Sequence, residues 1–287
     1  MQLSKTEILL LEQVAKGNKS IKSLVLALKV KKRRIYIIIN NLTKKGFIKR
    51  VNGTLEPKEA LHIKLFLEVL TIYPNLAPAI SDSGIPILTA LSKVSTIEEI
   101  SQETGFKKTT IYTKLGETRK RSIVRKTQTK YSLNEKIWAK LIDFLKELDK
   151  YESMTDERIP ASSTIYYKKN KEIIFASKEE TNAEKTAFSA YNKYGIKLLT
   201  VKNYYYLPKK TLTKEDVLRH SLYIVEKEKD IKNLIFIALF YTKFKNEFKI
   251  KHEILMNISV VLAKGNVKGY PNYQEIKDRA EVYGIKV

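Results

Sequence analysis

The chain has 287 residues and no cysteine, which excludes disulfide bonds, thiolate metal sites and cysteine catalysis. Its 54 Lys and Arg residues against 31 Asp and Glu give a formal net charge of +23, which favours a polyanionic partner such as nucleic acid. The competing interpretation is a Lys-rich surface that serves solubility or heat stability.

The first predicted element is an amphipathic helix from about Ser4 to Lys16. Its apolar positions recur at helical spacing, and Ser4 with Glu7 has the pattern of a capping box. Because this amphipathic segment begins within the first few residues, we expect no signal peptide. Because no apolar run reaches about 18 residues, we expect no membrane-spanning helix. A cytoplasmic, nucleoid-associated protein with no membrane partner is therefore expected.

An internal repeat is the most informative feature of the first half of the chain. Residues 20–50 and 96–126 align without a gap, with Ser20 opposite Thr96, and Thr96 with Glu99 has the pattern of a capping box. In each copy a helix N-cap, a short helix, a tight turn and a second helix follow one another. An amphipathic helix is also expected before the second copy, from about Ser83 to Lys93.

The second helix of each copy is expected to bury one face, and a β-hairpin is expected after it. The buried stripes are Ile35, Ile39 and Leu42, then Ile111, Leu115 and Thr118. The hairpins are Phe47–Val51 with a turn at Asn52-Gly53, and Ile123–Lys126 with a turn near Gln128 and a return through Lys130–Leu133.

Three helices followed by a β-hairpin are typical of one large family of DNA-binding domains. The stretches TIEEISQETGFKKTTIYTKL and NNLTKKGFIKR resemble the winged helix-turn-helix family of bacterial and archaeal transcription regulators. The resemblance covers roughly residues 1–55 and 82–135, and it implies binding to double-stranded DNA. The second copy departs from the family pattern at Thr118 and Arg121, and Gly116 falls inside its second helix.

Cations gather on the second helix, the turn before it and the hairpin of each copy, whereas Glu98, Glu99 and Glu103 fall on the supporting helix. Major-groove reading needs hydrogen-bond donors on the helix, and phosphates need cations around it. The candidate DNA-binding residues are Lys31, Lys32, Arg33, Arg34, Tyr36, Asn40, Lys44, Lys49 and Arg50, then Lys107, Lys108, Thr109, Tyr112, Thr113, Lys114, Arg119, Arg125 and Lys126.

Three apolar or aromatic side chains on these helices allow more than one interpretation. Tyr36 and Tyr112 either pack onto the hairpin or reach a base. Ile37 either touches thymine methyl groups or covers a neighbouring helix, and we expect the packing role.

The domain organisation follows from these elements. A linking helix is expected over Pro57–Tyr73, and a helix over Asn134–Tyr151, which carries Trp138, closes the second copy. The predicted domains are a first winged helix at 1–58, the linking helix at 59–80, a second winged helix at 81–151 and an α+β domain at 155–287. The predicted fold class is mainly α with small β. A homodimer would present four reading helices, and the linking helix is a candidate interface for it.

The last part of the chain mixes short strands with helices. Strands are expected at Thr164–Lys168, Glu172–Ala176, Lys197–Val201 and Tyr204–Leu207. Helices are expected at Glu180–Tyr194, Thr213–Glu228, Ile231–Lys243, His252–Lys264 and Asn272–Tyr283.

Two stretches of this part, YYYLPKKTLTKEDVLRHSLYI and GYPNYQEIKDRAEVYGI, resemble archaeal regulators similar to the antitoxins of abortive-infection type-E toxin–antitoxin pairs. The resemblance covers about 120 residues at the C-terminal end. It implies a protein partner for the C-terminal domain, a toxin of nucleotidyltransferase type. High Lys and Ile content without cysteine fits a heat-loving source.

No catalytic constellation is apparent in the sequence. The three histidines, His62, His220 and His252, lack metal-ligand spacing, and no phosphate-binding loop or paired general acid and base occurs. We expect no enzyme activity, no metal and no cofactor. The leading hypothesis is a sequence-specific transcription regulator with two reading helices. The alternatives are an architectural, replication or segregation factor that binds DNA with little sequence preference, and an antitoxin.

Overall fold

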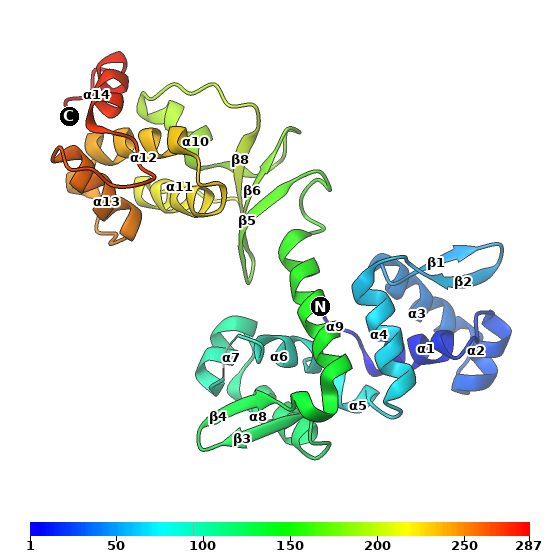
Figure 1. The fold of residues 1–287 in the computed structure, drawn as a ribbon. Coiled ribbons are helices and arrows are strands. Elements are labelled where there is room, and N and C mark those ends of the chain that lie inside the picture. The colour runs from blue at the N-terminus through cyan, green and yellow to red at the C-terminus, as the bar shows by residue number, and fades with distance from the viewer. Residues whose placement is uncertain (94) are drawn as a thin grey trace. The chain divides into compact units, whose positions relative to one another are not determined.

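The structure is a computed structural model that describes residues 1–93 and 95–287. The chain divides into two compact units, Met1–Ser153 and Met154–Val287. It is mainly helical with small antiparallel sheets, which confirms the predicted class of mainly α with small β (Figure 1). Among the described residues, no helix has both the length and the apolar content required to cross a bilayer.

The first repeat copy folds as three helices and a hairpin. These elements are α1 (Lys5–Ala15), α2 (Ile21–Leu28), α3 (Lys32–Lys44), β1 (Ile48–Val51) and β2 (Thr54–Pro57). The predicted capping box is present, because the Ser4 side chain accepts from the Glu7 N–H and the Glu7 side chain accepts from the Ser4 N–H. The hairpin turns at Asn52 and Gly53, which both have positive φ.

The second copy repeats this order. Its elements are α6 (Gly84–Ala90), α7 (Ile97–Thr104), α8 (Lys108–Arg119), β3 (Val124–Thr127) and β4 (Lys130–Leu133). The predicted box between Thr96 and Glu99 caps α7, and Gly105 ends it in the left-handed region at φ 72°. Figure 1 shows both hairpins, each beside its own helices.

The connection between the copies differs from the prediction. The linking helix α4 (Leu61–Ile72) begins after Ala60, because Pro57 is the last residue of β2 and pairs with Ile48. A short helix that was not predicted, α5 (Ala77–Ile80), has Pro78 in its first turn, where the missing N–H has no helical partner to lose. The closing helix α9 (Glu135–Met154) runs to the boundary between the units.

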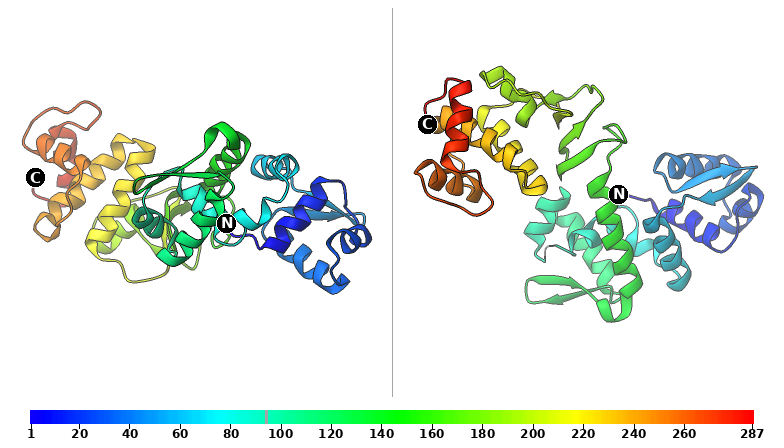
Figure 2. Two further views of the ribbon diagram at one scale, coloured as in Figure 1. Left: turned by 90° about the horizontal axis from the view of Figure 1, so that it is seen from below. Right: turned by 45° about the horizontal axis from the view of Figure 1, so that its top comes forward.

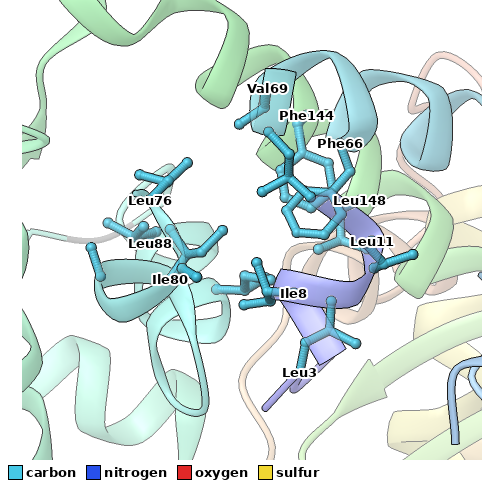
Figure 3. Close-up of a cluster of buried hydrophobic side chains, with 14 of the residues drawn as sticks. Leu3, Ile8, Leu11, Phe66, Val69, Leu76, Ile80, Leu88, Phe144 and Leu148 are labelled. Carbon is cyan, nitrogen blue, oxygen red and sulfur yellow. The ribbon is translucent and has the colours of Figure 1, made fainter. Parts of the chain in front are cut away.

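One continuous core joins the two copies within the first unit (Figure 3). Phe66 of α4 stacks on Phe144 of α9 with ring centroids 4.5 Å apart, and both side chains are fully buried. Ile8 of α1 lies in the same cluster, and α1 packs against both α4 and α5. The two copies therefore share one apolar core and do not form two separate cores.

The second unit has a four-stranded antiparallel sheet with strand order β5-β6-β8-β7 and a group of helices, which Figure 2 shows from two further directions. The strands are β5 (Thr164–Lys169), β6 (Glu172–Ser177), β7 (Glu184–Lys185) and β8 (Asn203–Leu207). The helices are α10 (Ala187–Ala190), α11 (Lys214–Glu228), α12 (Ile231–Lys243), α13 (Glu253–Leu262) and α14 (Tyr273–Val282), with short 3-10 turns at Tyr191–Tyr194 and Lys245–Glu247.

Two predictions for the second unit are wrong. The helix expected at Glu180–Tyr194 is instead β7, α10 and a 3-10 turn, because residues 184–185 pair with the tyrosines of β8. The strand expected at Lys197–Val201 is a loop in which Leu199 and Val201 are almost fully exposed. Local β preference does not form a strand where no neighbouring strand supplies hydrogen bonds.

A buried histidine links the sheet of the second unit to α11. The Nδ1 atom of His220 lies 2.7 Å from the Thr186 hydroxyl, and its ring stacks on Tyr206 with centroids 4.9 Å apart. Burial lowers the pKa of His220 to about 4, because the protonated ring would lose its hydration. His220 is therefore neutral in the folded protein at neutral pH.

This histidine predicts acid-sensitive stability in the second unit. Because the folded-state pKa lies below the unfolded value of 6.5, the unfolded state binds the proton first, and stability falls as the pH drops from 6.5 towards 4. A pKa shift of this size lowers the free energy of unfolding by about 3 kcal/mol once the pH is below both pKa values. Urea unfolding at pH 7 and pH 4.5 is expected to show a smaller pH effect in a His220→Gln variant than in the unaltered chain. An equal pH effect in both proteins would assign the acid sensitivity to other groups.

Candidate nucleic-acid interface

The exposed face of α3 results from the apolar stripe on its opposite side. Ile35, Ile38, Ile39 and Leu42 are buried against the core of the first unit, which leaves the remaining positions of the helix towards solvent. All candidate DNA-binding residues predicted in the first copy are exposed. They are Lys31, Lys32, Arg33, Arg34, Tyr36, Asn40, Lys44, Lys49 and Arg50.

An open hollow of about 550 Å³ lies between α3 and strand β1. Its lining consists of Arg33, Tyr36, Ile37, Ile39, Asn40, Thr43 and Arg50. The guanidinium of Arg50, which comes from the hairpin, lies 5.2 Å from the centre of the Tyr36 ring. Helix and hairpin thus present donors, an aromatic face and cations around one concave surface.

Ile37 is part of this hollow, and the expectation that it covers a neighbouring helix is wrong. Its side chain is 44% exposed and has no place in the core cluster of the first unit. A large aliphatic side chain left in water among cations has no structural role that the described residues explain. Thr43 also lines the hollow; its position three residues after Asn40 on the helix would have placed it there from the sequence.

The positive charge at the start of α3 has no acidic partner in the described part of the chain. No Asp or Glu occurs in the sequence between Glu12 and Glu56. Among the described residues, Lys49 reaches Glu56 at 3.7 Å and Lys45 reaches Glu7 at 2.8 Å, while the cations of the first α3 turn have no carboxylate within 4.0 Å. Those cations are Lys31, Lys32, Arg33 and Arg34.

These cations stand at the end of α3 where the helix dipole is positive. The N-cap residue Lys31 makes no side-chain capping bond, and the first turn holds no acidic residue. Positive side chains at a helix N-terminus are unfavourable by a few tenths of a kcal/mol each unless an anion is nearby. Free backbone N–H groups and cations at one helix end together fit a phosphate group.

The second copy presents a different surface. Lys108 Nζ lies 2.6 Å from Glu98 Oε1, and this hydrogen-bonded ion pair raises the pKa of Lys108 and lowers that of Glu98. Tyr112 is 55% exposed, and the Thr113 hydroxyl donates to the Thr109 carbonyl. The other candidates are exposed, namely Lys107, Arg119, Arg125 and Lys126.

Lys114 does not face solvent, so its assignment as a DNA-facing residue is corrected. Its side chain is 8% exposed, with Nζ 3.1 Å from the Pro78 carbonyl and 2.6 Å from Glu117 Oε2. In the repeat alignment Lys114 stands opposite Ile38, which is also buried. The sequence already contained this signal, because the alignment places a core residue at the same position.

A charge-matched pair of variants tests this correction. Lys114→Met keeps an unbranched apolar stem and removes one charge, as does Arg119→Gln on the exposed end of α8. If Lys114 is buried and Arg119 is exposed, Lys114→Met leaves the slope of log DNA affinity against log salt concentration unchanged. Arg119→Gln lowers it by about 0.9, the value for a single phosphate. A reduced slope for Lys114→Met alone would show that Lys114 reaches DNA.

Comparison of the chain with models of protein families, with curated proteins and with solved structures found no match. Within the described ranges, no group of three His, Asp or Glu side chains is placed to hold a metal ion.

Proposed function

We propose that this chain is a double-stranded DNA-binding protein and a sequence-specific transcription regulator, with tandem winged helix-turn-helix domains in Met1–Ser153. The hollow between α3 and the β1–β2 hairpin carries the proposal, because Arg33, Asn40 and Arg50 meet there without acidic neighbours. An α-helix with its side chains is about 10–12 Å wide, which matches a major groove about 12 Å wide.

Each residue of this face has a chemically suited target in the groove. Arg33 can donate two hydrogen bonds to the O6 and N7 atoms of guanine, and Asn40 can pair with the N6 and N7 atoms of adenine. Ile37 supplies an apolar surface for the methyl group of thymine. The exposure of Ile37 thus has a function in the complex that it lacks in the free protein.

The cations of the first α3 turn and of the hairpin serve the sugar–phosphate backbone in this proposal. Lys31, Lys32 and Arg34 surround the free N–H groups at the start of α3, where a phosphate is favoured. Such contacts fix the register of the helix in the groove but do not distinguish bases.

In this proposal the two copies make different kinds of contact with DNA. Thr109 and Gly116 stand in α8 where α3 has Arg33 and Asn40, so α8 lacks both long base-reading donors. The cations that remain around α8 and its hairpin suit phosphates, including Arg119, Arg125 and Lys126. The first copy therefore reads sequence, and the second copy holds the backbone of the same duplex.

Footprinting with methylation interference tests the proposal. Genomic fragments retained by the full chain are expected to show one protected site, with interference from methylation at N7 of guanine in the major groove. Interference only at adenine N3, in the minor groove, would contradict the reading role of α3. Absence of a protected site on every fragment would contradict sequence-specific binding.

Two observations favour an architectural role as the second candidate. The net charge of +23 and the loss of base-reading donors in α8 both support affinity through phosphates alone. In that case all duplexes of equal length bind alike, with steep salt dependence.

A further inference from the structure

The second unit carries a cluster of cations that the proposed function does not use. We call it the sheet-end cluster and define it as Arg158, Lys169, Lys171, Lys209 and Lys210. Strand pairing brings these residues together: Lys169 faces Glu172 at the tip of the β5–β6 hairpin, and Ile173 pairs with Leu207, two residues before Lys209. The hairpin tip and the chain leaving β8 therefore lie at the same end of the sheet.

The cluster is anchored by polar contacts. Arg158 Nε lies 2.8 Å from Asp156 Oδ1, and its Nη1 donates to the Lys171 carbonyl at 2.8 Å. Lys209 donates to Asn182 at 3.0 Å, and Lys210 lies over the Tyr206 ring at 5.0 Å. Ordered cations lose less conformational entropy when they bind than free lysine side chains do.

Three members of the cluster have no acidic partner within the described part of the chain. Lys169, Lys171 and Lys209 are exposed without a carboxylate within 4.0 Å, whereas Lys210 lies 3.8 Å from Glu172. Some lysines elsewhere in this unit have a carboxylate partner, as Lys193 has Glu184 at 2.8 Å and Lys214 has Glu247 at 2.7 Å. Lys169, Lys171 and Lys209 thus place three unpaired positive charges at one end of the sheet.

We propose that the sheet-end cluster is a second DNA-contacting surface, which binds phosphate groups of the duplex held by the first unit. The proposal rests on DNA binding by the first unit and adds a contact by the second. A hairpin tip with exposed lysines can follow a phosphate backbone, and such contacts are independent of sequence. Because both units belong to one chain, the second contact forms at high effective concentration and adds affinity without new selectivity.

The test compares two triple variants of the full chain. The test variant carries Lys169→Gln, Lys171→Gln and Lys209→Gln, and it leaves Lys210 in place because that side chain packs on Tyr206. The control variant removes three exposed lysines of the same unit outside the cluster, with Lys245→Gln, Lys249→Gln and Lys251→Gln. Thermal unfolding first shows that both variants fold like the unaltered chain.

Affinity is then measured over a series of KCl concentrations for the footprinted duplex and for a random duplex of equal length. The test variant is expected to lower the slope of log affinity against log salt by about 2 to 3, because each phosphate that a lysine no longer neutralises reduces it by about 0.9. The control leaves the slope unchanged, and the ratio of affinities for the two duplexes stays the same in both variants.

An unchanged slope in the test variant, or an equal change in test and control, would overturn the second contact. Failure of the proposed function has a different signature. It shows as equal affinity of the unaltered chain for the footprinted and the random duplex, whatever the slopes of the variants.

Discussion

Replacement of Asn40 by Ala is expected to weaken binding to the footprinted duplex by about 10- to 100-fold, since a bidentate contact to adenine contributes about 1–3 kcal/mol of discrimination. Affinity for random duplexes should hardly change, because Asn40 carries no charge and phosphate contacts provide non-specific affinity. Competition of labelled footprinted duplex against random duplex measures both quantities. Arg33→Ala is expected to reduce selectivity similarly, at a guanine position.

Asn41 offers a matched control for this prediction. It is the next residue of α3, is also exposed, and does not line the hollow. Asn41→Ala makes the same chemical change and is expected to leave the selectivity nearly unchanged, because Asn41 does not line the hollow. Equal losses for Asn40→Ala and Asn41→Ala would mean that the hollow is not the reading surface.

Truncation of Phe66 is expected to have the largest effect on stability. Phe66 is fully buried between helices of both copies, where it stacks on Phe144 (Figure 3). Phe→Ala changes in such cores lower the free energy of unfolding by about 3–5 kcal/mol, because transfer energy is lost and a cavity remains. The only tryptophan, Trp138, packs against the same core, so its fluorescence in urea reports unfolding of the first unit.

Phe240→Ala in the second unit is the control for this measurement. Phe240 is also fully buried, but it belongs to a separate cluster of the second unit. The Trp138 transition should therefore shift for Phe66→Ala and stay in place for Phe240→Ala. A similar shift for both variants would show that the two cores unfold as one cooperative system.

Local sequence signals predicted most of the first unit. Both capping boxes and the Asn52-Gly53 hairpin depend on neighbouring residues, and the structure contains all three. Repetition reinforced these signals, since each copy supported the interpretation of the other. The short helix at Ala77–Ile80 was missed because a helix of this length depends on packing more than on its own pattern.

Long-range contacts explain what the sequence did not reveal. Residues 184–185 became a strand because β8 pairs with them, which no local propensity predicts. Lys114 looked exposed because lysine is rarely buried, yet the Pro78 carbonyl and Glu117 satisfy its ammonium group. Ile37 looked like a packing residue because it is apolar, whereas its neighbours on the helix face are charged or polar.

The resemblance of the C-terminal part to antitoxins stays a prediction. Its two stretches fall mainly on β8, α11 and α14; the first includes Lys209 and Lys210 of the sheet-end cluster, and neither includes Lys169 or Lys171. A protein partner bound to the first stretch would therefore compete with DNA for Lys209 and Lys210 but not for the hairpin tip.

Binding to genomic fragments at about 50 and 200 mM salt, with unlabelled random DNA as competitor, tests the central claim most directly. We predict that a few fragments survive competition at both salt concentrations, although overall affinity falls steeply with salt. Equal displacement of every fragment by random DNA would contradict base reading by α3 and would favour an architectural protein.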